Sequence, residues 1–597
     1  MNRTPCRRWS LCGAPWLPIT LLGLLLCAPL LLTTCPGGHD IYHHLIFSHH
    51  FSSQLLQGDL YPRWLSEMNG GFGSPTFFFY PPVPYYLTTL FAWVPEQGAL
   101  GCSPLSFSIC LALILSGLTA YRWLREWSGR RMALLLALLY MVLPYHFLVD
   151  LYVRFSFGEF WSFVWMPLVL YYHRRIGQGE PGAIPGLALS LALLIGTHLP
   201  TFLIFMPVLI GASLLPSPRL PLISGYARHM LAMVLGIALA AIYWLPAMTT
   251  QDYVSMPSMY VGFMHYSNAF LSSWPTPEHG WTFRRYLMVI TVGTCLLGGL
   301  TWLWSRHQQP PATRLSSGYW LLVALGALAM TLPLSKPLWD LLPILQKIQF
   351  PWRFNTVLTP AVITLLAQAS CAIRQPPANG SGRLAIWSLL LAGLLATQLL
   401  VGLEPLFFDR LAAADIQRIT SISRSPLEYR PRWVPLEQFN KASLSWLGTV
   451  TPPVRSEPPA LHWRLKEWAP RQIRLDIQAP EAGTLTLHQY YYPGWVARRA
   501  EQEAPLALHP SGDGLLQITL PAGNYPLTVT LTPLPEELAG RWISLLALLG
   551  CLWLAWRRQK PEMCAKAVSQ LSQPIYSRYG FIWLRTLVLL RRTTTLV

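Results

Sequence analysis

The sequence predicts a polytopic α-helical membrane protein with about twelve transmembrane helices and a β-sandwich domain near its C-terminus. Of the 597 residues, 52% are hydrophobic and only 12% are charged, whereas about 25% charged residues are usual in a soluble domain. Long apolar runs recur along the chain, and a polar segment with alternating apolar residues precedes the last run. This composition excludes a soluble enzyme.

The first apolar run, from Leu11 to Thr34, follows three arginines, so it is either a signal peptide or a first membrane helix. The many later runs favour a retained helix. Further runs of about the 17 to 25 residues that cross a bilayer lie near 103–122, 131–149, 159–173, 183–197, 200–216, 230–248, 286–304, 317–334, 354–373, 384–403 and 541–556.

The segment from Pro82 to Val94 is also apolar, but it is short and rich in proline, which favours an interfacial or buried helix. If it does not span, both termini are cytoplasmic and the arginine clusters fall on the cytoplasmic side, as the positive-inside rule requires. The formal net charge of +18 is then mainly a topology signal, so no nucleic-acid partner is expected. The clusters are Arg122/Arg125/Arg130/Arg131, Arg174/Arg175, Arg219/Arg228, Arg306/Arg314, Arg374/Arg383 and Arg557/Arg558/Lys560.

The same topology collects polar residues on the outer face. Charged side chains near span ends need partners or a wet cavity, because a charge at membrane depth costs about 2.5 to 3.5 kcal/mol. For any one such residue, an ordinary solvated loop position is the simpler interpretation. The set comprises Asp40, His43, His44, Asp59, Arg63, Arg154, Glu159, His198, Asp252, Glu278, His279, Lys336, Asp340, Lys347 and Arg353.

The first outer loop, about residues 35–100, is the most informative stretch. If Asp40 to Leu56 is helical, Asp40 and His44 share a face. Together they could form a general base with its orienting partner, or two metal ligands, or a plain interfacial pair. Gly70, Gly71 and Gly73 precede an aromatic run without a following Gly-Lys-Ser/Thr, which excludes a P-loop and indicates a packing role or a lipid groove.

A polar segment at about 405–538 separates the eleventh and twelfth spans. Its second half alternates in QIRLDIQ, TLTLHQYYYPGWVA, GLLQITL and YPLTVTLTP, divided by turn residues, and this pattern predicts an antiparallel β-sandwich on the outer face. The ten cysteines include no CxxC pair, so neither a zinc ribbon nor a disulfide-stapled domain is expected. The predicted organisation is a transmembrane domain at 1–404, the β-domain at 405–538, a last helix at 539–557 and a cytoplasmic tail at 558–597.

Several motifs carry a resemblance to a known family. GHDIYHHL, GDLYPRW, GGFGSPTFFFYPPVPYYL, VRFSFGEFWSFVWMPLVLYY, THLPTFLIF and LLPILQKIQFPWRFN resemble the bacterial membrane proteins called "6-pyruvoyl-tetrahydropterin synthase-related". YYYPGWVA and LPAGNYPLTVTLTP resemble the outer domain of the YfhO-type family. The first name describes no activity of this chain, because pterin synthases are small soluble zinc enzymes.

Both families look related to the GT-C glycosyltransferases, which use polyprenyl-phosphate sugars and carry an acidic base or metal ligand just after the first helix. Asp40 occupies that place, but His39 precedes it where many GT-C enzymes have a second acid. The metal requirement therefore stays open. The resemblance implies a GT-C-like fold in the bacterial cytoplasmic membrane, with an extracytoplasmic site and no nucleotide cofactor.

The implied reaction moves a sugar from a polyprenyl-phosphate donor to a glycan, lipid or protein acceptor of the envelope. The alternative is a non-catalytic membrane component that binds or translocates lipid-linked envelope precursors. A scaffold that only displays the β-domain would leave the charges near the span ends without a purpose. The implied catalytic residues are Asp40 and His44, and the implied substrate-binding residues are Arg154, Glu159, His198 and Arg353, with Lys336 and Lys347 in reserve.

Overall fold

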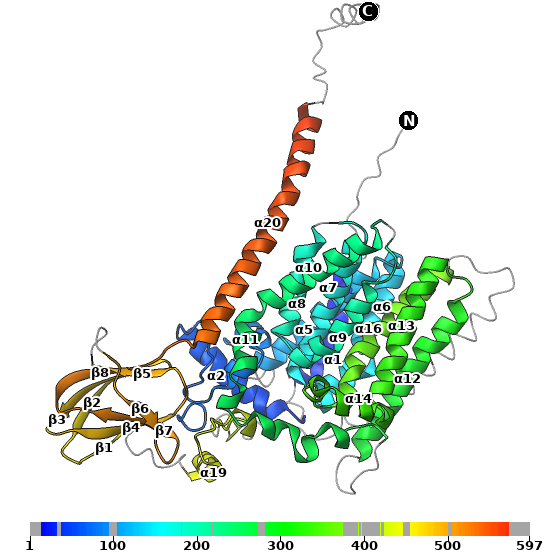
Figure 1. The fold of residues 1–597 in the computed structure, drawn as a ribbon. Coiled ribbons are helices and arrows are strands. Elements are labelled where there is room, and N and C mark those ends of the chain that lie inside the picture. The colour runs from blue at the N-terminus through cyan, green and yellow to red at the C-terminus, as the bar shows by residue number, and fades with distance from the viewer. Residues whose placement is uncertain are drawn as a thin grey trace, which may run out of the picture.

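The computed structural model shows a large helical bundle with two β-sheets beside it and one long helix that leaves the sheets along the bundle (Figure 1). The described residues are 14–32, 38–94, 104–180, 182–217, 219–272, 281–373, 418–419, 423–445, 454–499 and 504–571, together with 392 and 396.

Helices form at the predicted apolar runs, except that the run near 384–403 lies outside the described residues apart from 392 and 396. These sequences are apolar on all sides, as expected of helices that pack in a bundle or face lipid. The helices are α1 (Trp16–Leu32), α5 (Pro104–Leu124), α6 (Arg130–Val142), α7 (Phe157–Gly177), α8 (Ala183–Ile195), α9 (Leu199–Ala212), α10 (Leu222–Leu239), α12 (Trp281–Ser305), α13 (Pro311–Met330), α16 (Asn355–Ile373) and α20 (Pro535–Leu571).

Five described helices are long and apolar enough to cross a membrane, and a sixth is added if α13 and the segment after its 90° bend form one broken span. Three shorter apolar helices accompany them, at Trp16–Leu31, Ala183–Ile195 and Leu199–Ala212. Within the described part of the chain, there are thus fewer candidate spans than the predicted twelve.

One predicted span is displaced along the chain. The run at 230–248 was expected to cross as one helix, but α10 ends at Leu239 and a separate helix, α11 (Ala241–Thr249), follows. The helix starts as early as Leu222 because Pro221 directly precedes it, and proline favours a helix start. Arg228 therefore lies inside the helix rather than in the loop before it.

The first outer loop contains three helices: α2 (Ile41–Leu56), α3 (Thr76–Phe79) and α4 (Val83–Thr89). The predicted helix after Asp40 is confirmed as α2. The proline-rich segment forms only the seven-residue α4, far short of the roughly 20 residues that span a bilayer.

Short elements complete the end of the bundle that carries this loop. The η2 segment (Tyr145–Val153) is π-helical and continues α6. The rest are one- or two-turn helices on the connections: η3 (Gln251–Tyr253), η4 (Met256–Tyr260), η5 (Gly262–Met264), η6 (Tyr266–Asn268), η7 (Pro333–Ser335), α14 (Lys336–Leu341), α15 (Pro343–Gln346), η8 (Pro351–Phe354), η10 (Leu427–Tyr429) and α19 (Leu436–Ser445).

The C-terminal strands form two four-stranded antiparallel sheets, in the orders β1-β4-β7-β6 and β2-β3-β8-β5. The alternating stretches become β3 (Gln472–Ala479), β4 (Gly483–Tyr490), β5 (Trp495–Arg498), β7 (Leu515–Leu520) and β8 (Gly523–Leu531). The sequence did not reveal β1 (Val454–Glu457), β2 (His462–Ala469) and β6 (Leu508–Pro510). These three strands lie at sheet edges and bury few side chains, so they lack a clear alternation.

The glycine-rich part of the first loop packs against the β-strands rather than lining a lipid groove. The Trp64 indole N–H donates to Gln489 Oε1 (2.9 Å), and the Gln489 amide donates to the carbonyl of Gly71 (2.6 Å). Gly73 has φ +82°, and a Cβ there would lie 2.4 Å from the Trp64 ring, so only glycine fits. The loop thus connects the sheets to the helical bundle.

A buried ion pair joins this loop to the last helix. Arg63 Nε lies 2.9 Å from Glu537 Oε2, with the two side chains 0% and 1% exposed. Arg63 also donates through Nη2 to the carbonyl of Ile242, at the start of α11 (2.6 Å). One guanidinium therefore holds the first loop, α11 and α20 together.

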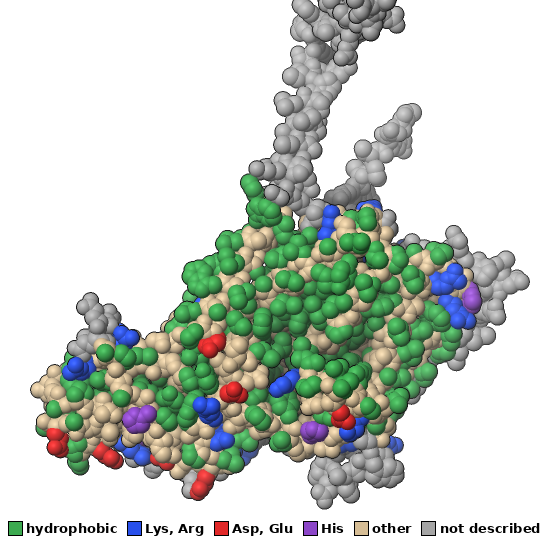
Figure 2. Space-filling model, in the orientation of Figure 1, with side chains coloured by type: hydrophobic (Ala, Val, Ile, Leu, Met, Phe, Trp, Pro, Cys, Tyr) green, Lys and Arg blue, Asp and Glu red, His purple; other side chains and the backbone are tan. Residues whose placement is uncertain are grey.

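Hydrophobic side chains cover the middle of the helical part, and charged side chains gather along its lower and upper margins (Figure 2). Exposed leucines and tryptophans along α20, such as Trp542 and Leu546, belong to this apolar surface. This distribution fits a protein whose middle lies in a bilayer.

Replacing Glu537 by Gln should strongly destabilise the protein, because it leaves a buried guanidinium without its counter-charge, a loss of about 3 to 5 kcal/mol. The loss of stability can be measured as a fall in the unfolding temperature of the detergent-solubilised protein. The matched control is Asp476→Asn, which breaks the half-exposed Lys466–Asp476 pair (2.9 Å) and should cost about 0 to 1 kcal/mol. Equal effects of the two changes would contradict the structural role given to Arg63.

Candidate functional site

A cavity of about 360 Å³ opens at the end of the bundle that carries the first outer loop. Its walls come from the Phe79–Pro81 stretch, the start of α9, α11 and the connections η4 and η10. Most of the lining is aromatic or aliphatic, and His198, Lys347 and Arg353 add basic groups. Such a mixture suits a ligand with an apolar body and a polar or anionic end.

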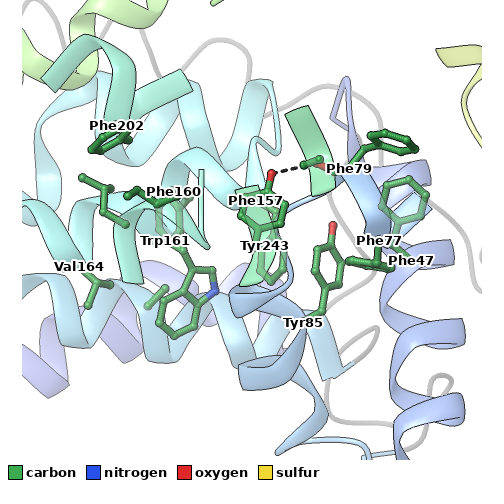
Figure 3. Packing of buried hydrophobic residues seen from close by; sticks show 14 of the residues in the cluster. Phe47, Phe77, Phe79, Tyr85, Phe157, Phe160, Trp161, Val164, Phe202 and Tyr243 are labelled. Atoms are coloured by element: carbon green, nitrogen blue, oxygen red, sulfur yellow. Dashed lines mark hydrogen bonds between the residues drawn. The ribbon is translucent and has the colours of Figure 1, made fainter. Parts of the chain in front are cut away.

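Buried aromatic side chains from α2, α7, α9 and the first loop pack beside this cavity (Figure 3). Tyr243 donates from its hydroxyl to the carbonyl of Phe79 (2.9 Å). This bond joins α11 to the aromatic run that follows the glycines. The aromatic run predicted from the sequence is therefore part of the wall that shapes the cavity.

Glu159, in the first turn of α7, is the centre of a buried network. Its Oε1 accepts from the hydroxyl of Tyr145 (2.7 Å), and its Oε2 accepts from Arg154 Nη1 (2.8 Å) and Ser156 Oγ (3.3 Å). Arg353 Nε lies 3.4 Å from the same Oε2. Glu159 is 0% exposed and does not line the cavity, so it acts through its neighbours.

Arg154 is held between two carboxylates. Its Nη1 lies 2.8 Å from Asp150 Oδ1 and 2.8 Å from Glu159 Oε2. The π-helical η2 ends at Val153, and its geometry places Asp150 and Arg154 on one side. π-Helical turns are frequent at functional sites. With Arg353, the network contains two carboxylates and two guanidiniums, which balances its charge.

Arg353 is the member of this network that reaches the cavity. It lies in η8 and is 11% exposed. Its Nη1 donates to the carbonyl of Ile348 (2.7 Å), and its guanidinium lies 5.1 Å from the centre of the Phe350 ring. Gln349, which also lines the cavity, has φ +72°. A left-handed non-glycine residue costs about 1 to 3 kcal/mol, and such strain concentrates at functional sites.

Asp40 lies next to Arg154 through the backbone. Its N–H donates to the carbonyl of Arg154 (3.0 Å), and the N–H of His39 donates to that of Val153 (3.3 Å). Phe155, directly after Arg154, is the second strained residue here, with φ +53°. Among the described residues, no hydrogen-bond or ion-pair partner is found for the half-buried carboxylate of Asp40.

The sequence suggested that His44 pairs with Asp40, but His44 has another partner. Its Nδ1 lies 2.8 Å from the hydroxyl of Tyr85, and Tyr85 in turn is hydrogen-bonded to Tyr80. Tyr80 lines the cavity, and the negative charge of Asp40 adds to burial in raising its pKa. A chain of three side chains thus runs from His44 to the neighbourhood of Asp40. Burial lowers the pKa of His44 to about 3, so the ring is neutral.

His198 caps α9 and lines the cavity. Its Nδ1 lies 2.7 Å from Thr201 Oγ1 and accepts from the N–H of Thr201 (3.3 Å). Nε2 therefore carries the proton. Burial and then the positive charge of Arg353 lower the pKa of His198 to about 3. His198 consequently offers a neutral N–H donor.

Three further residues of the site were not predicted: Asp150, Tyr80 and Glu428. Glu428 lies in η10 beside the cavity residue Tyr429, and burial raises its pKa, with the charge of Asp40 as a smaller cause. No short-range pattern marks Glu428, since it comes from the polar segment far along the chain. Asp150 could be inferred only from its spacing of four residues to Arg154.

Of the other residues that the sequence placed on the outer face, one lines the cavity and others form ion pairs away from it. Lys347 lines the cavity, with Nζ 4.8 Å from the centre of the Tyr260 ring. Lys336 pairs with Asp340 on the surface (2.7 Å), and Asp59 pairs with Arg471 of the β-domain (3.3 Å). Glu278 and His279 lie outside the described residues. Within the described ranges, no group of three His, Cys, Asp or Glu residues is placed to hold a metal ion.

Several solved structures are similar to part of this chain. They include the Archaeoglobus fulgidus oligosaccharyltransferase in the apo form (12% identity, TM-score 0.41, 68% of this chain and 57% of that chain). The arabinofuranosyltransferase AftD from Mycobacteria follows, with 16% identity, TM-score 0.41, and 68% and 27% of the two chains. ArnT from Cupriavidus metallidurans, bound to undecaprenyl phosphate, has 13% identity and TM-score 0.38, with 74% and 77% covered.

These TM-scores are too low for the likeness to carry an argument about activity. The chain spans about 57% of the length of the archaeal enzyme. No curated protein matches the sequence. Residues 77–404, more than half of the chain, match the family of membrane proteins with a 6-pyruvoyl-tetrahydropterin synthase related domain. The chain belongs to this family.

Proposed function

We propose that this protein is a membrane glycosyltransferase that moves a sugar from a polyprenyl-phosphate donor to an envelope glycan, lipid or protein. The proposal includes about twelve spans, cytoplasmic termini, a β-sandwich made of the two sheets, and a site on the extracytoplasmic face of a bacterial inner membrane. The proposal rests on the carboxylate of Asp40, which has no hydrogen-bond or ion-pair partner among the described residues. It lies near Tyr80, which lines an apolar cavity with Arg353 in its wall.

The cavity supports a donor of this chemistry. A polyprenyl phosphate has an apolar tail and an anionic phosphate, and the leaving phosphate needs positive charge where the bond breaks. Arg353 supplies a planar guanidinium suited to phosphate oxygens, and Lys347 adds a second cation in the wall. His198 adds a neutral donor. Glu159 and Arg154 are then positioning residues, because they hold Arg353 without lining the cavity.

The polyprenyl tail of such a donor also has a route to the cavity. The segment after α13 turns by 90°, and its leucines point outward, with Leu334 and Leu341 81% and 73% exposed. Ile344 and Lys347, which follow, line the cavity. An apolar outer surface therefore continues into the wall, as a lipid substrate requires.

The proposed step is a displacement at the anomeric carbon. The acceptor hydroxyl gives its proton to Asp40 while its oxygen bonds to the anomeric carbon. The bond between that carbon and the phosphate oxygen breaks, and polyprenyl phosphate leaves with the electron pair beside Arg353. Tyr80, linked through Tyr85 to His44, borders this place. No nucleotide is needed for this chemistry.

The alternative is a protein that binds or translocates lipid-linked precursors without turning them over. The same cavity and cations would serve it. The two functions differ at Asp40, since a binding protein does not need a base there.

Asp40→Asn should lower transfer from a radiolabelled polyprenyl-phosphate sugar by about 10²- to 10⁴-fold, because the amide cannot accept the proton. Donor binding should stay within about twofold. Asp252→Asn is the control, since this carboxylate is exposed on the outer face. Full activity of the Asp40 variant would overturn the assignment. Binding without turnover in the unaltered protein would favour the precursor-binding alternative.

Arg353→Gln should lower the transfer rate by about 10²- to 10³-fold. This is the usual loss when one preorganised hydrogen-bond donor to the charge that develops in the transition state is removed. Arg353→Lys should restore part of the loss. The control is Arg432→Gln, which removes an outer arginine beside Trp433 and away from the cavity wall. Wild-type rates in Arg353→Gln would show that the phosphate is held elsewhere.

Glu428→Gln should keep most of the transfer rate, whereas Glu428→Ala should lose about tenfold. The raised pKa of Glu428 favours a neutral carboxyl that hydrogen-bonds substrate, and an amide of the same shape can replace it. Initial transfer rates of the two Glu428 variants across pH 5 to 8 test this expectation. If Glu428→Gln is as inactive as Asp40→Asn, Glu428 and not Asp40 is the better candidate for the base.

A further inference from the structure

A second cavity, of about 410 Å³, lies at the opposite end of the bundle. Helix α7 carries Glu159 in its first turn and His173 and Arg174 near its last turn, and these last two line the second cavity. Helix α9 likewise has His198 at its start and Ser213 at its end. Along α9, the rise from His198 in the first cavity to Ser213 in the second is about 22 Å, which sets the two cavities apart.

This end of the bundle is strongly basic. The helix ends and connections at 121–131, 173–180, 217–229 and 305–316 contain ten arginines, against two acids, Glu126 and Glu180. Arg174 lines the cavity, and its guanidinium lies 3.4 Å from the centre of the Trp127 ring. Its Nε is 3.9 Å from Glu126 Oε2, a carboxylate that Arg175 also approaches (3.7 Å). Glu126 thus faces two guanidiniums, and Arg175 pairs more closely with Glu180 (2.7 Å).

A pair of buried histidines forms the inner wall. The rings of His173 and His229 lie 4.1 Å apart. His229 Nδ1 is 2.7 Å from the carbonyl oxygen of Gly225, and its Nε2 is 2.9 Å from that of His173. Carbonyl oxygens only accept, so the ring satisfies both contacts only with a proton on each nitrogen. Among the described residues, no carboxylate pairs with His229.

The outer wall is apolar and open to the lipid side. Leu222 and Leu315 line the cavity, and each is 52% exposed. Ile223 and Leu214, their neighbours on the surface, are 85% and 56% exposed. The cavity therefore has a basic, polar interior that continues into an apolar surface of the helices.

We propose that this second cavity binds the phosphate headgroup of an anionic phospholipid, with its acyl chains along Leu222 and Leu315. Basic pockets between helix ends at the membrane surface are suited to such headgroups. Arg174 would contact the phosphate, and His229, whose two ring nitrogens already contact carbonyl oxygens, would form the wall behind it. The tryptophans of the cavity wall would lie at headgroup depth. This site is separate from the proposed transfer site and does not depend on that function.

The test compares ligands by thermal unfolding of the purified full chain in a neutral detergent. Short-chain phosphatidylglycerol should raise the unfolding temperature saturably, because it binds the folded state, while short-chain phosphatidylcholine and inorganic phosphate should not. Arg174→Gln should weaken the phosphatidylglycerol effect at least tenfold in concentration, and Arg174→Lys should keep most of it. Arg306→Gln is the control, since Arg306 lies at the same end over Trp302 and does not line the cavity.

Equal shifts with phosphatidylcholine would overturn the proposal, because they indicate binding by the acyl chains alone. A full shift with inorganic phosphate would assign the cavity to a free anion instead of a lipid. Equal weakening by Arg306→Gln would show that general surface charge causes the effect. If Arg174→Gln does not fold, loss of the shift in a His229→Gln variant that does fold supports the site, and an unchanged shift overturns it.

Discussion

The outer end of this molecule depends on the carboxylate of Glu159. It is fully buried, yet it joins Tyr145, Arg154, Ser156 and Arg353. Burying charges is costly unless each is paired and hydrogen-bonded, and here two acids and two guanidiniums balance. Because Arg154 already contacts Asp150 and Glu159, it has little capacity for a ligand. Arg353 shares the same anchor but reaches the cavity, so the network fixes one cation in the cavity wall.

The rest of the outer end encloses this arrangement. The first loop wraps from α2 past the glycines to the cavity wall, and it is held from outside by the β-strands through Trp64 and Gln489. Asn69 accepts from Ser425 (2.9 Å) and so ties the loop to the segment that carries Glu428 and Tyr429. The β-strands therefore have a structural part here, because they hold the loop after Asp40, and that loop in turn bonds to the stretch with Glu428.

Local patterns in the sequence predicted the helix after Asp40, most apolar helices and the inner strands, because hydrophobic periodicity is a local signal. The predicted topology also placed Arg154, Glu159, Arg353 and His198 on the same side of the membrane. The sequence could not predict that His44 bonds to Tyr85, 41 residues away, or that Glu428 approaches Asp40. Such partners depend on tertiary packing, as does the protonation of His198, which burial and Arg353 decide. The predicted roles of these residues stay predictions.

A cryo-electron microscopy structure with a polyprenyl phosphate in nanodiscs would show whether the cavity holds a lipid phosphate at Arg353. The expected result is phosphate density within hydrogen-bond distance of Arg353 and His198, with the tail leaving past Ile344. Phosphate density only at the arginine-rich end, beside Arg174, would contradict it. That result would move lipid-phosphate recognition to the other side of the bundle and leave Asp40 without a substrate.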